Sequence, residues 1–201
     1  MPAKETFQLN RLLKNIPATE GARKLAPGEG QRFDIAGVHL TWKVKGEDSG
    51  YAFSICEQDL GPGEGVALHS HPYAEVFYIL EGTVDFCRIL DDKEEWIRCE
   101  MGSTMILPAN CFHAFDNKTG KPCRLLGIST QLHQAFFDAV ERADASAPFS
   151  ELPASELVAR VTAIGAEYCM NFAPPDADAD GREELRARAG SRTWQHRYEP
   201  R

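Results

Sequence analysis

The sequence predicts an all-β fold, a sandwich or barrel of antiparallel strands followed by two helices. Between residues 31 and 130, short apolar runs alternate with clusters of turn-forming residues at nearly regular spacing, which is typical of antiparallel sandwiches and barrels. Within several runs apolar and polar residues alternate, and this period of two gives a strand one buried face. After Thr130 the apolar period lengthens to that of a helix.

The clearest predicted strand is residues 38–45, where Val38, Leu40, Trp42 and Val44 alternate with polar residues. Seven further strands are predicted from their composition and from the turns that separate them. They cover residues 51–60, 75–80, 83–90, 94–100, 103–107, 111–115 and 123–130.

Two amphipathic helices are predicted after these strands. The first covers residues 131–142, and the second covers residues 153–170 with Ser155 as its N-cap. Both place apolar side chains on one face, and such faces pack most simply against the outside of the barrel. The chain thus divides into an N-terminal segment (1–30), a barrel (31–130), two helices (131–172) and a tail (173–201).

Both ends of the chain are interpreted separately from the barrel. The N-terminal segment contains a short helical pattern at residues 9–16. The tail is polar, with acidic and basic residues in equal number, so we expect it to be flexible or ordered by a partner.

The composition narrows the classes of partner. Lys and Arg total 22 against 30 Asp and Glu, which gives a formal net charge of −8. Proteins that bind nucleic acid carry an excess of basic residues, so we expect no nucleic-acid partner. No apolar run approaches the roughly 20 residues of a membrane helix, and no apolar segment of a secretory signal follows the first residues. We therefore expect a cytoplasmic protein without a membrane partner. Its six cysteines lie far apart in the sequence, and we expect them to be free thiols.

Two histidines and a glutamate at close spacing form a candidate metal site. His69 and His71 are two residues apart, so on an extended strand both side chains point to one face. A turn at residues 72–74 lets Glu75 return from the next strand, and His113 begins a later strand. Three imidazoles and a carboxylate suit a divalent transition metal, and iron, nickel, cobalt, manganese, copper and zinc are all candidates.

These segments resemble the two sequence motifs of the cupin superfamily. The first motif, Gly-x5-His-x-His-x3-Glu-x6-Gly, is matched by Gly63, His69, His71, Glu75 and Gly82. The second, Gly-x5-Pro-x-Gly-x2-His-x3-Asn, is matched by Gly102, Pro108, His113 and Asn117, with Asn110 in place of the third fixed residue, a glycine. Asparagine tolerates a positive φ, so we expect the turn to be kept. The resemblance implies a jelly-roll barrel with His69, His71, Glu75 and His113 as metal ligands.

A wider resemblance covers roughly residues 25–175. Residues 25–30, 46–54, 166–168 and 172–175 look like those of single-domain bacterial cupins related to quercetin 2,3-dioxygenase. This implies a dioxygenase for a small aromatic or enolic, flavonol-like substrate, with Glu75 alternating between metal ligand and general base. Cupins commonly pair through barrel edges, so the resemblance also implies a homodimer.

Other functions remain open on the same residues. The four ligands also permit non-oxidative isomerase or lyase chemistry, or binding of a small molecule without its transformation. Isolated histidines are more often surface or core residues than ligands, and His39, His133 and His196 are interpreted in this way.

Four residues near the proposed ligands are candidates for pocket walls. Phe77 and Ile79 share the strand parity of Glu75, and Phe115 shares that of His113. Cys111, two residues before His113, completes the set. A barrel core requires the same kinds of residue, so packing is the alternative role for all four.

Overall fold

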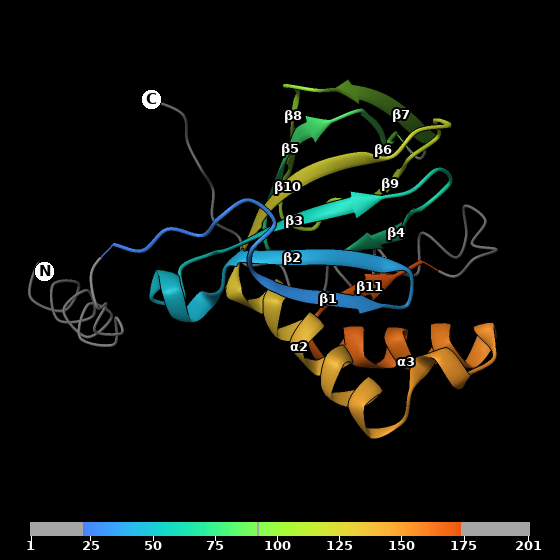
Figure 1. The fold of residues 1–201 in the computed structure, drawn as a ribbon. Coiled ribbons are helices and arrows are strands. Elements are labelled where there is room, and N and C mark those ends of the chain that lie inside the picture. The colour runs from blue at the N-terminus through green and yellow to red at the C-terminus, as the bar shows by residue number, and fades with distance from the viewer. Residues whose placement is uncertain (1–21, 92, 174–201) are drawn as a thin grey trace, which may run out of the picture.

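A computed structural model describes residues 22–91 and 93–173, in which eleven strands form two antiparallel sheets (Figure 1). The first sheet has the order β1 (Gln31–Ile35), β2 (Val38–Val44), β3 (Ser54–Leu60), β10 (Cys123–Ser129), β5 (Glu75–Glu81) and β8 (Thr104–Leu107). The second has the order β11 (Asn171–Phe172), β4 (Gly65–Ser70), β9 (His113–Asp116), β6 (Thr83–Leu90) and β7 (Lys93–Glu100). The two sheets form a jelly-roll barrel, as predicted.

The main core fills the space between the two sheets. Its centre is a group of three rings, Phe77, Phe86 and Phe115, whose centroids lie 5.3–5.6 Å apart. Ile79 is fully buried in the same cluster, and Cys111 packs against it. All four pocket candidates therefore contribute to core packing, while their role as pocket walls stays a prediction.

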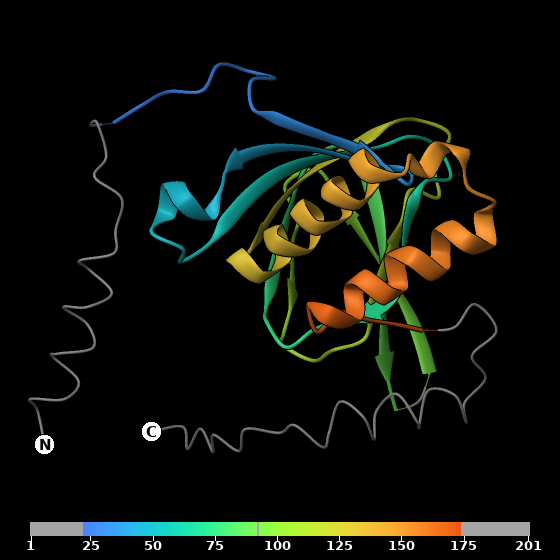
Figure 2. The same cartoon turned by 90° about the horizontal axis from the view of Figure 1, so that it is seen from below.

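Two helices cover the end of the barrel between the edge strands β1 and β11. Helix α2 (Gln131–Ser146) contacts β1 and β3, and α3 (Ala154–Glu167) contacts β11. Figure 2 shows both helices lying across this end of the barrel. Their apolar faces form a second core with the first strands, and it contains Phe33, Leu40, Trp42, Cys56, Phe136, Val140, Phe149 and Met170. The two predicted C-terminal helices are thus confirmed.

The helix limits differ from the predicted ones. Pro153 is the N-cap of α3 and Ser155 lies inside the helix, so the predicted serine cap is wrong. Proline suits this end because it lacks the N–H that a first turn leaves unpaired. Helix α2 continues past Arg142 to Ser146, and two of these four residues are alanine, the best helix former. It ends before Pro148, which disfavours a helical conformation at the preceding residue.

The strand limits also required corrections. The predicted strand over residues 51–60 begins only at Ser54, because a short 3-10 helix (Gly46–Ser49) and a turn with Tyr51 at φ 65° precede it. Strands β1 and β11 were not predicted. The turn between β1 and β2 has positive φ at both Ala36 and Gly37, the geometry of a tight hairpin turn, and alanine is an uncommon residue there.

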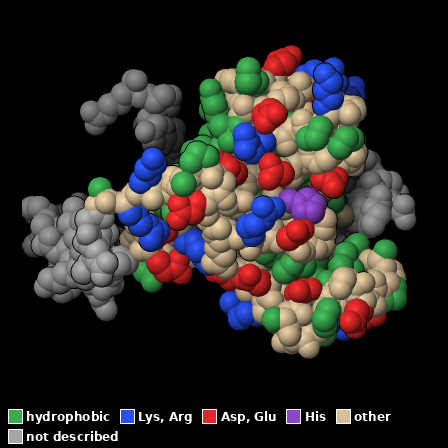
Figure 3. Space-filling view, in the orientation of Figure 1, with side chains coloured by type: hydrophobic (Ala, Val, Ile, Leu, Met, Phe, Trp, Pro, Cys, Tyr) green, Lys and Arg blue, Asp and Glu red, His purple; other side chains and the backbone are tan. Residues whose placement is uncertain are grey.

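The described residues also bear on the state of the cysteines, on membrane-spanning helices and on the surface charge. All six cysteines are thiols rather than disulfides, and burial is the main cause that raises the pKa of Cys56 to about 12. No helix in the described part of the chain has the length and apolarity to cross a membrane. Acidic and basic side chains are interspersed on the face drawn in Figure 3. The 9–16 pattern, His196 and all of the tail after residue 173 lie outside the described residues, and the proposed segment boundaries stay predictions.

Candidate metal centre

Four buried side chains converge between the two sheets. His69 lies near the end of β4, His71 follows that strand, Glu75 begins β5 and His113 begins β9. One potential ligand atom from each residue lies within 4.8 Å of those of the others. Sequence positions more than forty residues apart are thus brought into one group, as the sequence analysis predicted.

Strand pairing explains why these residues meet. His69 lies directly opposite His113 in the β4–β9 pair, and the ring centroids are 4.2 Å apart. Strand β4 ends at Ser70, so His71 lies just outside it rather than within an extended strand. The backbone N–H of Asn110 donates to the carbonyl of His71 over 2.7 Å, which joins the turns of the two motifs.

Each imidazole is held by a backbone carbonyl behind it. The Nδ1 atoms of His69 and His71 lie 2.8 Å from the carbonyl oxygens of residues 67 and 73, and Nδ1 of His113 lies 3.1 Å from that of residue 111. A carbonyl only accepts hydrogen bonds, so each Nδ1 carries a hydrogen. This arrangement fixes the ring and leaves Nε2 as the atom for a metal.

The inward atoms fit a bound cation. Nε2 of His71 lies 3.1 Å and Nε2 of His113 lies 3.4 Å from Oε2 of Glu75. Among the described residues, Nε2 of His113 has no hydrogen-bond partner of good geometry although it is buried. An imidazole nitrogen and a carboxylate oxygen come this close only with a proton or a metal ion between them, and a set of three imidazoles and one carboxylate suits a divalent transition metal.

The electrostatics of the group follow from burial and proximity. Burial lowers the pKa of His69 well below its usual value, which keeps this ring neutral. Burial also opposes ionisation of Glu75, but the surrounding histidines, with His133 the largest contributor, hold its pKa well below the usual range. Burial opposes protonation of His113, yet its close contacts with the Cys111 side chain and the Glu75 carboxylate raise its pKa to about 9. Metal binding here would release that proton.

Three further residues enclose the group. Tyr73 stacks on His71 with ring centroids 4.0 Å apart, and Phe172 of β11 stacks on His69 at 5.7 Å. The buried hydroxyl of Tyr73 has no hydrogen-bond partner among the described residues. His133 of α2 contacts Glu75, with 3.2 Å between its Nδ1 and Oε1 of the carboxylate. Helix α2 and β11 therefore form one side of the site.

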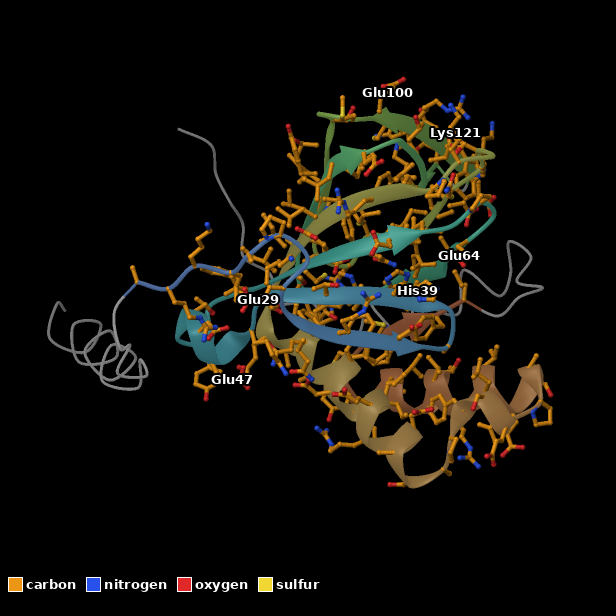
Figure 4. All side chains as sticks on the ribbon, viewed as in Figure 1. Glu29, His39, Glu47, Glu64, Glu100 and Lys121 are labelled. Atoms are coloured by element: carbon orange, nitrogen blue, oxygen red, sulfur yellow. The ribbon has the colours of Figure 1, made fainter. Side chains whose placement is uncertain are left out.

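The histidines interpreted as ordinary residues differ from one another. His39 on β2 is partly exposed and bonds to Asp34 over 2.7 Å, and Figure 4 shows it beside Glu64, as expected of a surface residue. His133 is not among the four residues of the group, as interpreted, but it contacts one of the proposed ligands from another element. No local pattern predicts this contact, since His133 lies alone in a helical segment.

Cys111 lies beside the group without joining it. Its Sγ is 3.9 Å from Nδ1 of His113, on the side away from the inward Nε2, and its carbonyl oxygen accepts from the same Nδ1. The thiol also packs against the main core. The contact supports packing and orientation of His113 as its role.

The turn before β9 provides a first testable prediction. Asn110 has φ 66°, which confirms the expected left-handed conformation. We expect Asn110→Ala to reduce the free energy of unfolding by about 1–2 kcal/mol, because alanine lacks the short polar side chain whose local hydrogen bonds let asparagine adopt this conformation. Asn110→Gly will cost nothing measurable, since glycine adopts it freely. Urea unfolding of both variants checks this, and equal stabilities for them would contradict it.

Comparisons with known proteins agree with this architecture. Residues 56–129, which include all four side chains of the group, match the family model Cupin_2, a cupin domain. The jelly-roll barrel is a cupin fold, and the resemblance to the two cupin motifs is confirmed for this part of the chain.

Curated relatives match over the same limited length. A germin-like protein of Morus alba is 31% identical over 75 residues, which are 36% of this chain and 35% of that protein. The auxin-binding protein ABP19a of Prunus persica is 30% identical over 76 residues, 37% of this chain and 36% of that protein. The match spans little more than a third of either relative.

Solved structures resemble the chain at lower identity. The polyketide cyclase RemF of Streptomyces resistomycificus aligns with a TM-score of 0.49 and 18% identity over 55% of this chain and 80% of that one. A predicted oxalate decarboxylase of Thermotoga maritima aligns with a TM-score of 0.46 and 20% identity over 54% of this chain and 98% of that one.

Proposed function

We propose that this protein is a metal-dependent dioxygenase that acts on a small aromatic or enolic, flavonol-like substrate. The observation that carries the proposal is the buried group of three carbonyl-bonded imidazoles and one carboxylate, with the donor atoms directed at one another. His69, His71, Glu75 and His113 are the proposed ligands. A divalent transition metal held by these four residues would offer open coordination positions together with Lewis-acid and redox chemistry.

The chain's own residues would prepare this site in three ways. The backbone carbonyls hold the imidazoles in one orientation, so no rearrangement is needed on binding. The rings of Tyr73 and Phe172 cover His71 and His69 and exclude water. Glu75 would accept the proton of a substrate hydroxyl at a carboxylate oxygen, which is the general-base role proposed for it. The core residues Phe77, Ile79 and Phe115, with Cys111, would form the apolar floor below the ligands.

Oxygen consumption tests the proposed reaction. The purified protein, loaded in turn with iron, nickel, cobalt, manganese, copper and zinc, is mixed anaerobically with a panel of flavonols and simpler enols. Dioxygen is then added. We expect one metal to support oxygen uptake equal to the substrate consumed, with both atoms of isotopically labelled dioxygen in the product. No uptake with any metal across the panel would refute the proposal.

Binding of a small molecule without its transformation is the second candidate. It is favoured by one observation, the auxin-binding protein among the matched relatives. Stoichiometric metal and a tightly held ligand that is recovered unchanged would establish this function. Turnover that continues without oxygen would instead indicate the isomerase or lyase chemistry that the same ligands permit.

The proposal also covers the location, the partners and the oligomeric state of the protein. We infer a cytoplasmic homodimer without nucleic-acid or membrane partners, supported by the net charge of −8 and by the open edges of β7 and β8, which pairing would cover. Sedimentation of the full chain tests the dimer, and a monomer at micromolar concentration would contradict it.

A further inference from the structure

The two oxygens of Glu75 have different surroundings. Oε2 faces His71 and His113 across the centre of the group, at 3.1 and 3.4 Å from their Nε2 atoms. Oε1 points the other way and lies 3.2 Å from Nδ1 of His133. The side chains of Glu75 and His133 are only 3% and 13% exposed. A buried carboxylate needs a partner for each oxygen, because water is not available to solvate it.

We propose that His133 is a positioning residue, whose Nδ1–H holds Oε1 of Glu75 so that Oε2 stays directed at the metal. The inference rests on the metal site of the proposed function and deepens it, because helix α2 becomes part of the metal centre. Metal ligands are generally oriented by a second hydrogen bond on the side away from the metal. The three histidines obtain that bond from backbone carbonyls; Glu75 obtains it from His133.

The fold holds His133 firmly enough for this role. Phe137, one turn further along α2, packs edge-on against the imidazole with centroids 4.9 Å apart, and it also contacts Phe33 and Trp42 of the first two strands. The next residue, Gln134, accepts a buried hydrogen bond of 2.6 Å from the backbone N–H of Gly46. These contacts tie the first turn of α2 to the barrel.

The geometry distinguishes this role from two others. A histidine that only fills the core has no need of a buried carboxylate, yet Nδ1 of His133 lies 3.2 Å from one. A fifth ligand would lie with the other donors, but the close group consists of His69, His71, Glu75 and His113, and the ring of His133 is centred 6.3 Å from that of His71. His133 acts on the metal through Glu75.

Two substitutions separate the hydrogen bond from packing. His133→Phe keeps an aromatic ring against Phe137 but removes the N–H. His133→Asn places an amide N–H where Nδ1 lies. His39→Phe is the matched control, because His39 also bonds to a carboxylate but lies on the surface away from the group. Each full-length protein is titrated with cobalt(II) against a chelator, and the visible absorption spectrum of its cobalt form is recorded.

We expect His133→Phe to bind cobalt about 10–100-fold more weakly, the loss typical of an outer partner of a metal ligand, and to show shifted visible bands. His133→Asn and His39→Phe will retain the parent affinity within about threefold, with the parent spectrum. Native cobalt affinity and spectrum in His133→Phe would overturn the inference, as would an Asn variant no better than Phe. Loss of affinity in the His39 control would also overturn it, because the effect would then not be specific.

The outcome separates this inference from the proposed function. A parent protein that binds cobalt but consumes no oxygen with any metal fails only as a dioxygenase. A cobalt-binding parent whose His133→Phe variant is unchanged fails only in the role of His133. A parent that binds no cobalt overturns both. Circular dichroism of each variant shows whether weaker binding reflects the site or a failure to fold.

Discussion

Replacing His69 and His113 together with alanine is expected to abolish metal binding and the thermal stabilisation that accompanies it. The two residues face each other across the β4–β9 pair, so their loss removes two of the four proposed ligands from one side. In the parent, metal at 100 times its dissociation constant stabilises the folded state by about 2.7 kcal/mol. For a chain of this size that raises Tm by roughly 5–11 °C, whereas the variant will show no shift.

The double substitution is needed because three protein ligands are enough for many catalytic metal sites. A variant with a single alanine would therefore retain part of the affinity. The measurement is the difference in Tm with and without metal, so a lower stability of the metal-free variant does not affect it. His39→Ala serves as the control and should keep the full shift. A metal-dependent shift that survives in the double variant would place the binding site elsewhere in the chain.

The convergence of the four proposed ligands was predictable because three of them lie close together in the sequence. His69 and His71 lie around one strand end, Glu75 follows a short turn, and only His113 comes from a distant segment. The second sequence motif identified that residue, and strand pairing placed it opposite His69. Expected strand limits were mostly accurate for the same reason, since alternation and turn residues are local features.

The enclosure of the site was not predictable from local patterns. His133 and Phe172 reach it through packing of α2 and β11 against the barrel, and neither lies in a recognisable motif. Strand β11 has two residues, too few for any periodicity. The proposed cap at Ser155 failed because a proline two residues earlier begins the helix equally well. Long-range packing decided the placement of His133 and Phe172, whereas the helix start was decided by a neighbouring residue.

Asn117 is expected to contribute more to stability than any other residue of the two motifs outside the metal group. Its side chain is completely buried. Nδ2 donates to the carbonyls of Leu60, Gly61 and Lys121, and Oδ1 accepts from the backbone N–H and hydroxyl of Thr119. The side chain thus joins the end of β9 to the turn between β3 and β4. We expect Asn117→Ala to reduce the free energy of unfolding by roughly 2–4 kcal/mol, because several of these groups lose their partner together.

Thr119→Ala is the matched control in the same turn. It removes a single hydroxyl that bonds to Oδ1 of Asn117 and to the carbonyl of Lys121, and it should cost only about 0.5–1.5 kcal/mol. Asn117→Asp should be at least as destabilising as alanine at neutral pH, because a carboxylate oxygen would face three carbonyl oxygens without a donor between them. Chemical unfolding measures all three variants. Asn117 lies four residues beyond His113, roughly 13 Å along the strand, so the folded alanine variant should bind cobalt with the parent affinity. A large loss of cobalt affinity with unchanged stability would instead assign Asn117 to the metal centre.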